Sequence, residues 1–146
     1  VKFFAHEPVM AMLSYSNFGS DKQGSPLKVH EAIDFLHKTY PDMVVDGEMQ
    51  VNFALDKKLR DDMYPFNKLK GQDVNTLIFP NLSSANSAYK LLDTLGITET
   101  IGPIQMGLNK PIHFTDVESS TRDIVNLTTV AVVDAIVQEQ IEKENR

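Results

Sequence analysis

The chain has 146 residues, of which 42% are hydrophobic and 23% are charged, and its formal net charge at pH 7 is −6. This length and composition indicate a soluble globular domain with its own core and exclude a mainly disordered chain. The lysines and arginines are scattered, so no basic stripe predicts binding to nucleic acid or to an anionic membrane. Cysteine is absent, which excludes disulfides and thiolate chemistry and favours a cytoplasmic location.

Metal and membrane signals are weak. The four histidines form no HExxH or i,i+4 pair, so no dedicated transition-metal site is predicted. The longest apolar run, residues 130–137, is too short to span a bilayer and contains Asp134. We expect no membrane anchor, and the start at Val1 rather than methionine indicates a piece of a longer protein.

Up to residue 96, predicted strands and helices alternate. Compact apolar runs predict strands over 8–16, 42–49 and 75–80. Helical spacing predicts a helix over 26–39 with Ser25 as its N-cap, and a second over about 50–60. A third helix is predicted to start at a Ser83 or Ser84 cap and to end at Gly96. This alternation is typical of an α/β fold with a parallel sheet.

The last third of the chain is less regular. Residues 101–108 and 110–114 predict either two short strands or a strand and a connecting segment. Ser120 and Asp123 match a capping box, which predicts a helix start there. Residues 124–136 are apolar nearly all round, so we expect this helix to be buried on more than one side, against its sheet and a partner subunit or domain.

In parallel α/β sheets ligands bind beyond the carboxyl ends of the strands, so the loops there are candidate sites. Residues 14–20 predict either a phosphate-binding loop or a capped surface turn. Asp46 and Glu48 predict either acid–base or metal chemistry or, as we favour, a cap for the following helix. His113 is expected to be packed or hydrogen-bonded rather than catalytic.

Five segments in order, MLSYSNFGS, PDMVVDGEMQVNFAL, LIFPNLSSANSAYKLL, GPIQMGLNKPIH and DIVNLTTVAVVDA, resemble the C-terminal part of phosphate acetyltransferases over residues 8–137. The resemblance implies an α/β fold whose mostly parallel sheet is flanked by helices in three layers, with a long C-terminal helix. It also implies a subdomain over 1–115 and a closing helix over 116–146 that packs on a neighbouring subdomain or dimer partner.

Three positions depart from that family. Where active members carry serine and arginine after the KPV segment, this chain has Asp116 and Val117. Phe18 stands where the family has lysine or arginine. Because an aspartate repels an anionic substrate and a valine cannot clamp phosphate, catalysis by this domain is not expected. With Phe18, Met49 and His113, the chain is more similar to the degenerate acetyltransferase-like domain of large bacterial malic enzymes.

That resemblance implies a regulatory and oligomerisation domain, with acetyl-CoA as possible effector and a homo-oligomer formed through the terminal helix. The parent enzyme would carry upstream malic and NAD(P)-binding domains and use NAD or NADP with Mg or Mn, and this part would bind no cofactor. The expected ligand contacts are Ser14, Ser16, Asn17, Gly19, Ser20, Asn86, Lys110 and Thr115. The alternative is the C-terminal part of a divergent phosphate acetyl- or butyryltransferase.

Overall fold

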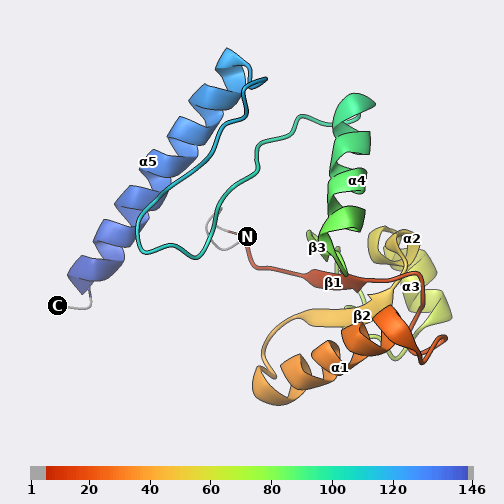
Figure 1. Ribbon diagram of the computed structural model, residues 1–146. Coiled ribbons are helices and arrows are strands. Elements are labelled where there is room, and N and C mark those ends of the chain that lie inside the picture. The colour runs from red at the N-terminus through yellow and green to blue at the C-terminus, as the bar shows by residue number, and fades with distance from the viewer. Residues whose placement is uncertain (1–5, 145–146) are drawn as a thin grey trace. The chain divides into compact units, whose positions relative to one another are not determined.

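The computed structural model describes residues 6–144, which fall into two units that divide between Leu91 and Leu92. The predicted boundary at residue 115 stays a prediction. The helices and strands in chain order are β1 Met10–Leu13, α1 Gly24–Thr39, β2 Val45–Met49, α2 Val51–Leu55, α3 Lys57–Met63, β3 Thr76–Ile78, α4 Leu82–Thr94 and α5 Thr121–Glu144 (Figure 1).

The three strands form one parallel sheet in the order β2-β1-β3. Consecutive strands are joined through helices, as parallel pairing requires. The predicted α/β fold with a parallel sheet and a long C-terminal helix is therefore confirmed. All three strands end at the same edge of the sheet, and the loops that follow them meet there.

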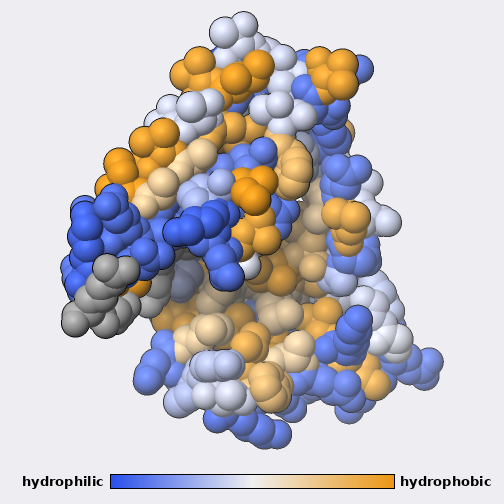
Figure 2. All heavy atoms as spheres, turned by 60° about the vertical axis from the view of Figure 1, so that its left-hand side comes forward, coloured by the Kyte–Doolittle hydropathy of each residue, from blue (hydrophilic) through white to orange (hydrophobic). Residues whose placement is uncertain are grey.

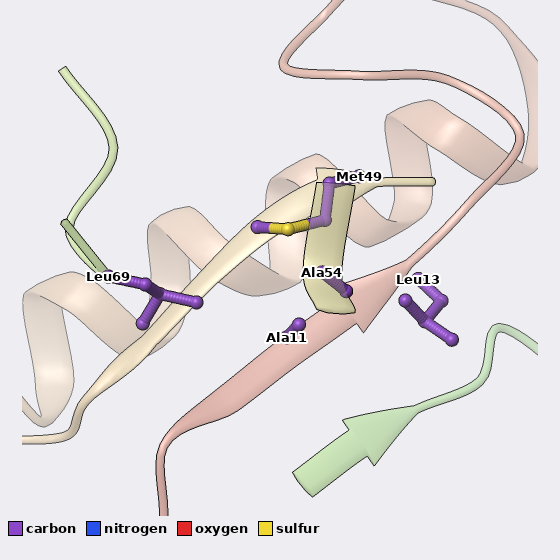
Figure 3. Packing of buried hydrophobic residues seen from close by; sticks show 5 residues of the cluster. All are labelled: Ala11, Leu13, Met49, Ala54 and Leu69. Atoms are coloured by element: carbon purple, nitrogen blue, oxygen red, sulfur yellow. The ribbon is translucent and has the colours of Figure 1, made fainter. Parts of the chain in front are cut away.

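The core of the first unit is a small cluster on one face of the sheet. Ala11 and Leu13 of β1 alternate with residues that face the other way, and they pack with Met49, Ala54 and Leu69 (Figure 3). On α1, Val29 and Ile33 are buried, and this helix packs against β2 and β1. The cluster and α1 together hold the sheet, and with it the strand ends, in place.

Two predicted helix starts were wrong in their caps. The first helix begins at Gly24 after Gln23, whose side chain makes no capping bond, so Ser25 lies inside the first turn. At α4 the backbone N–H of Ser84 donates to Asn81 Oδ1 over 2.9 Å, so Asn81 caps the helix instead of Ser83 or Ser84. Because β3 ends at Ile78 and α4 begins at Leu82, Asn81 is the N-cap residue that directly precedes the helix.

The predicted helix over 50–60 is two helices. Asp56 ends α2 in an extended conformation, and its Oδ1 accepts the N–H of Leu59 over 2.9 Å to begin α3. An aspartate that competes for backbone donors is a common reason for such a break. The break separates α2, which packs on β1, from α3.

The strands predicted within 101–114 were wrong, because residues 101–116 form neither helix nor strand. Pro103 and Pro111 cannot donate to a ladder, which disfavours strand pairing in this segment. A Lys110–Glu142 pair at 3.5 Å joins this segment to α5, and an Arg122–Glu99 ion pair joins α5 to the residues just before the segment.

The start of α5 confirms the predicted capping box. The Ser120 N–H donates to Asp123 Oδ2 over 2.8 Å, and the Asp123 N–H donates to Ser120 Oγ over 3.2 Å. In the single chain Leu127 and Val130 of the helix are buried, and burial of its other sides stays a prediction. Figure 2 shows hydrophobic residues exposed along α5. By length and hydropathy the helix also meets the criteria for a membrane span, as core helices of soluble proteins do.

Candidate functional site

A pocket of about 600 Å³ lies in the first unit, at the edge where the three strands end. Its volume falls in the range of roughly 300–1,000 Å³ that is typical of small-molecule sites. The lining residues follow the three strands or belong to their last positions and to nearby helix starts: Leu13, Ser14, Tyr15, Ser25, Gln50, Val51, Asn52, Phe79, Pro80, Asn81 and Ser84. The position agrees with the rule that parallel α/β sheets bind ligands beyond the carboxyl ends of their strands.

The loop after β1 is folded onto the end of β2. The Ser14 N–H donates to the Met49 carbonyl over 2.9 Å. Gln50 then makes two bonds to the loop: its N–H donates to Asn17 Oδ1 over 2.8 Å, and its Nε2 donates to the Tyr15 carbonyl over 2.7 Å. These bonds fix the backbone of the loop, so Ser14 and Tyr15 are presented to the pocket.

Glu48 lies beneath this loop and is completely buried. Its Oε1 accepts the Ser16 hydroxyl over 2.9 Å and the Gly19 N–H over 2.6 Å. Its Oε2 lies 3.3 Å from His30 Nδ1. A buried carboxylate needs such donors to replace water, and here the loop and α1 supply them. The predicted helix-capping role of Glu48 was therefore wrong.

Asp46 is also buried and does not cap the helix either. Its Oδ2 accepts the backbone N–H of Lys68 over 2.6 Å, and Gln50 precedes α2 without a side-chain cap. Neither Asp46 nor Glu48 lines the pocket. Within residues 6–144 no group of three metal-ligating side chains comes together. The two acids thus serve the fold by holding neighbouring loops.

Tyr15 is the most exposed aromatic residue of the pocket, with 64% of its surface accessible. Its hydroxyl donates to Asp21 Oδ2 over 2.8 Å. This hydrogen bond, followed by partial desolvation and then the charge of Asp21, raises the pKa of the Tyr15 hydroxyl. Tyr15 therefore offers a neutral, oriented ring at the rim of the pocket.

The eight predicted ligand contacts do not all meet. Ser14 lines the pocket, while the others of the first loop make internal bonds: the Ser16 and Ser20 hydroxyls lie 2.9 Å apart, and Asn17 and Gly19 bind Gln50 and Glu48. Asn86 is exposed on α4 and does not line the pocket. Lys110 and Thr115 belong to the second unit, and ligand contact by all eight residues stays a prediction.

Phe18 belongs to an aromatic cluster. Its ring centroid lies 4.8 Å from that of Tyr64 and 5.3 Å from that of Phe66, with Phe53 packed against Tyr64. Such tilted and edge-on pairs are favourable arrangements of aromatic rings. The side chain at position 18 therefore joins the loop after β1 to the segment after α3.

The other two substituted positions lie in a turn before α5. Asp116 Oδ1 accepts the N–H of Val117 over 2.7 Å, and Ser119 Oγ accepts the N–H of Asp116 over 2.9 Å. The Val117 side chain is fully exposed. This turn holds no cation at 116 or 117, so these positions offer nothing that attracts a phosphate group.

His113 is partly buried, and within residues 6–144 neither ring nitrogen has a hydrogen-bonding partner. Of the two expected roles, packed or hydrogen-bonded, the structure favours packing. No acid or nucleophile is hydrogen-bonded to the ring, which gives His113 no catalytic partner in the described part of the chain.

Several polar pocket residues were missed from the sequence: Tyr15, Ser25, Gln50, Asn52, Asn81 and Ser84. Gln50 follows β2 directly, and Asn81 is the third residue after β3. Both residues lie just beyond predicted strands. Because such positions converge at one edge of a parallel sheet, their place in the sequence could have identified them as pocket residues.

Comparison with known proteins places this geometry in a family. A profile described as phosphate acetyl/butaryl transferase matches residues 1–132. An NADP-dependent malic enzyme of Salmonella typhimurium is 40% identical over 138 residues, which cover 92% of this chain and 18% of that enzyme. A phosphate acetyltransferase of Clostridium acetobutylicum is 38% identical over 129 residues, or 88% of this chain and 38% of that protein.

A phosphotransacetylase from Streptococcus pyogenes has a similar structure, with a TM-score of 0.83 and 38% identity over 92% of this chain and 41% of that one. The chain belongs to the phosphate acetyl/butaryl transferase family. The expected resemblance to malic enzymes and phosphate acetyltransferases is confirmed. The chain spans less than half of each of these relatives.

Proposed function

We propose that this chain is a non-catalytic acetyl-CoA-sensing and oligomerisation domain of a cytoplasmic NAD(P)-dependent malic enzyme, which oxidatively decarboxylates malate to pyruvate. The observation that carries the proposal is the 40% identity to an NADP-dependent malic enzyme over nearly the whole chain. The loss of charge at Phe18 and Val117 and the added negative charge of Asp116 support a domain without acetyl transfer.

The pocket at the strand ends supports a sensing role. Apolar side chains, among them Leu13, Val51 and Phe79, line it together with serine, asparagine and glutamine side chains, a mixture suited to an uncharged acyl or pantetheine-like chain. An effector regulates an enzyme only if it binds one of two states more tightly. A domain that binds acetyl-CoA at this pocket in one assembly state and less well in another meets this requirement.

The exposed face of α5 supports the assembly role. Apolar side chains there are largely solvent-accessible in the single chain, among them Val125, Val132 and Ile136. Exposed apolar surface of this kind is typical of surfaces covered in an assembly. The upstream malic and NAD(P)-binding domains, with NAD or NADP and Mg or Mn, would supply the chemistry.

Acetyl-CoA titration of the full-length protein tests the sensor role. We expect malate-dependent NAD(P)H formation or the oligomeric state to change across the titration. An Asn52→Phe variant, which narrows the pocket from its exposed rim, should weaken the response. Lys28→Phe, on an exposed position of α1 outside the pocket, is the matched control. An unchanged rate and oligomeric state in the wild type would remove the sensor role.

The second candidate is the C-terminal part of a divergent phosphate acetyl- or butyryltransferase, which the 38% identity to an acetyltransferase favours. Acetyl phosphate formation from acetyl-CoA and phosphate by the full-length protein separates the two. Robust turnover would establish the transferase and refute our interpretation of Asp116 and Val117.

A further inference from the structure

Near its end, β2 contains a one-residue β-bulge at Glu48. Met12 pairs with Gly47, and the next residue, Leu13, pairs with Met49, so Glu48 has no partner on β1. A bulge of this kind turns a side chain out of its regular direction, and bulges are common next to functional sites. Gly47 makes the approach possible, because a Cβ there would lie 2.5 Å from the Met12 carbonyl oxygen.

The bulge turns both polar ends of Glu48 toward the loop after β1. Its backbone carbonyl accepts the N–H of Phe18 over 2.7 Å, in addition to the two bonds that its Oε1 accepts from Ser16 and Gly19. Three donors within four consecutive loop residues thus end on one residue of β2. The conformation of the loop depends on where this carboxylate is held.

His30 is the only partner of the second carboxylate oxygen in the described part of the chain. Its ring belongs to α1, and 45% of its side chain is exposed, whereas Glu48 is fully buried. With Glu48 as carboxylate, the Nδ1–H of His30 is the donor. The contact therefore links a surface helix to the loop through a single buried side chain.

We propose that Glu48 and His30 are positioning residues that hold the loop of residues 14–20 in the conformation that presents Ser14 and Tyr15 to the pocket. His30 fixes Oε2, which leaves Oε1 directed at Ser16 and Gly19. Neither residue lines the pocket, so they act on a ligand only through the loop. The proposal rests on the function proposed above in naming acetyl-CoA as that ligand.

Hydrogen exchange of the ligand-free, full-length protein tests the positioning itself. In His30→Leu, we expect the peptide that covers residues 14–20 to exchange ~10-fold faster, because a bond to a charged group is lost. His30→Asn keeps an N–H donor near the position of Nδ1 and should restore slow exchange. Lys28→Leu, an exposed change on the same helix, is the control. Unchanged exchange in His30→Leu, or equal acceleration in His30→Asn, would overturn the proposal.

A second measurement tests the consequence for the ligand. We expect His30→Leu to raise the half-saturating concentration of acetyl-CoA by ~10-fold, while the KM for malate and the turnover without acetyl-CoA stay unchanged. A purely structural defect would lower turnover as well. If acetyl-CoA has no effect on the wild type, the proposed function fails, and the exchange experiment still decides the role of His30.

Discussion

Gly47→Ala should disrupt the sheet more than any other glycine substitution in the first unit. Gly47 has a φ of 144°, a conformation that is essentially open to glycine alone, and the added Cβ would lie 2.5 Å from the Met12 carbonyl oxygen. The backbone strain costs about 1–3 kcal/mol. Forcing the strands apart costs about 1–3 kcal/mol more. We therefore expect a loss of ~4 kcal/mol.

Hydrogen exchange of the full-length protein measures this loss locally, on peptides that cover Met10–Leu13 and Val45–Met49. A loss of ~4 kcal/mol corresponds to roughly 10³-fold faster exchange. Gly71→Ala is the matched control, because Gly71 has a φ of 75° but a Cβ there would meet nothing within 4 Å. Its cost should be ~1–2 kcal/mol. Equal protection of β1 in the two variants would refute the steric argument.

Three further predictions follow from single side chains. Arg60→Met should cost ~3 kcal/mol and expose the segment after α3 to limited proteolysis, because the buried guanidinium donates to the carbonyls of three residues; an unchanged cleavage rate would contradict this. The Ser120 hydroxyl and N–H lower the pKa of Asp123, so the cap is complete above the unfolded-state pKa and is lost as pH falls through the folded one. An NMR titration should give Asp123 a midpoint below that of an ordinary aspartate, which Ser120→Ala raises; no change in that variant would refute the cap. Asp21→Asn should lower the pKa of the Tyr15 hydroxyl in a tyrosinate absorbance titration, and a constant midpoint would exclude the contact.

Features encoded by neighbouring residues were predictable from the sequence. The capping box at Ser120 needs only residues three apart, and the C-cap at Gly96, which has a φ of 63°, needs only a glycine after a helix. The three strands of the first unit were predictable because a compact apolar run between turn residues usually forms a buried strand in an α/β chain. From the order of these elements the parallel sheet followed.

Features that depend on distant residues were not predictable. The role of Glu48 depends on a bulge, which is a property of two paired strands rather than of the DGE motif itself. The apolar pulses within 101–114 suggested strands, but a strand needs a partner, and sequence does not show that none is available. The position of the pocket was predictable. The presence of Tyr15 at its rim was not, because the orientation of Tyr15 depends on hydrogen bonds with Gln50 and Asp21.

The steric requirement for glycine at position 47 limits which substitutions this domain can accept. Phe18 lies in an aromatic cluster and Val117 in an exposed turn, so neither side chain meets a backbone constraint like that at Gly47. Gly47 and Glu48 hold the end of β2 and the loop after β1, so a substitution there disturbs the sheet and the loop whichever function the domain has. A DGE segment at this position is therefore a sign of the architecture and a poor guide to which reaction a domain performs.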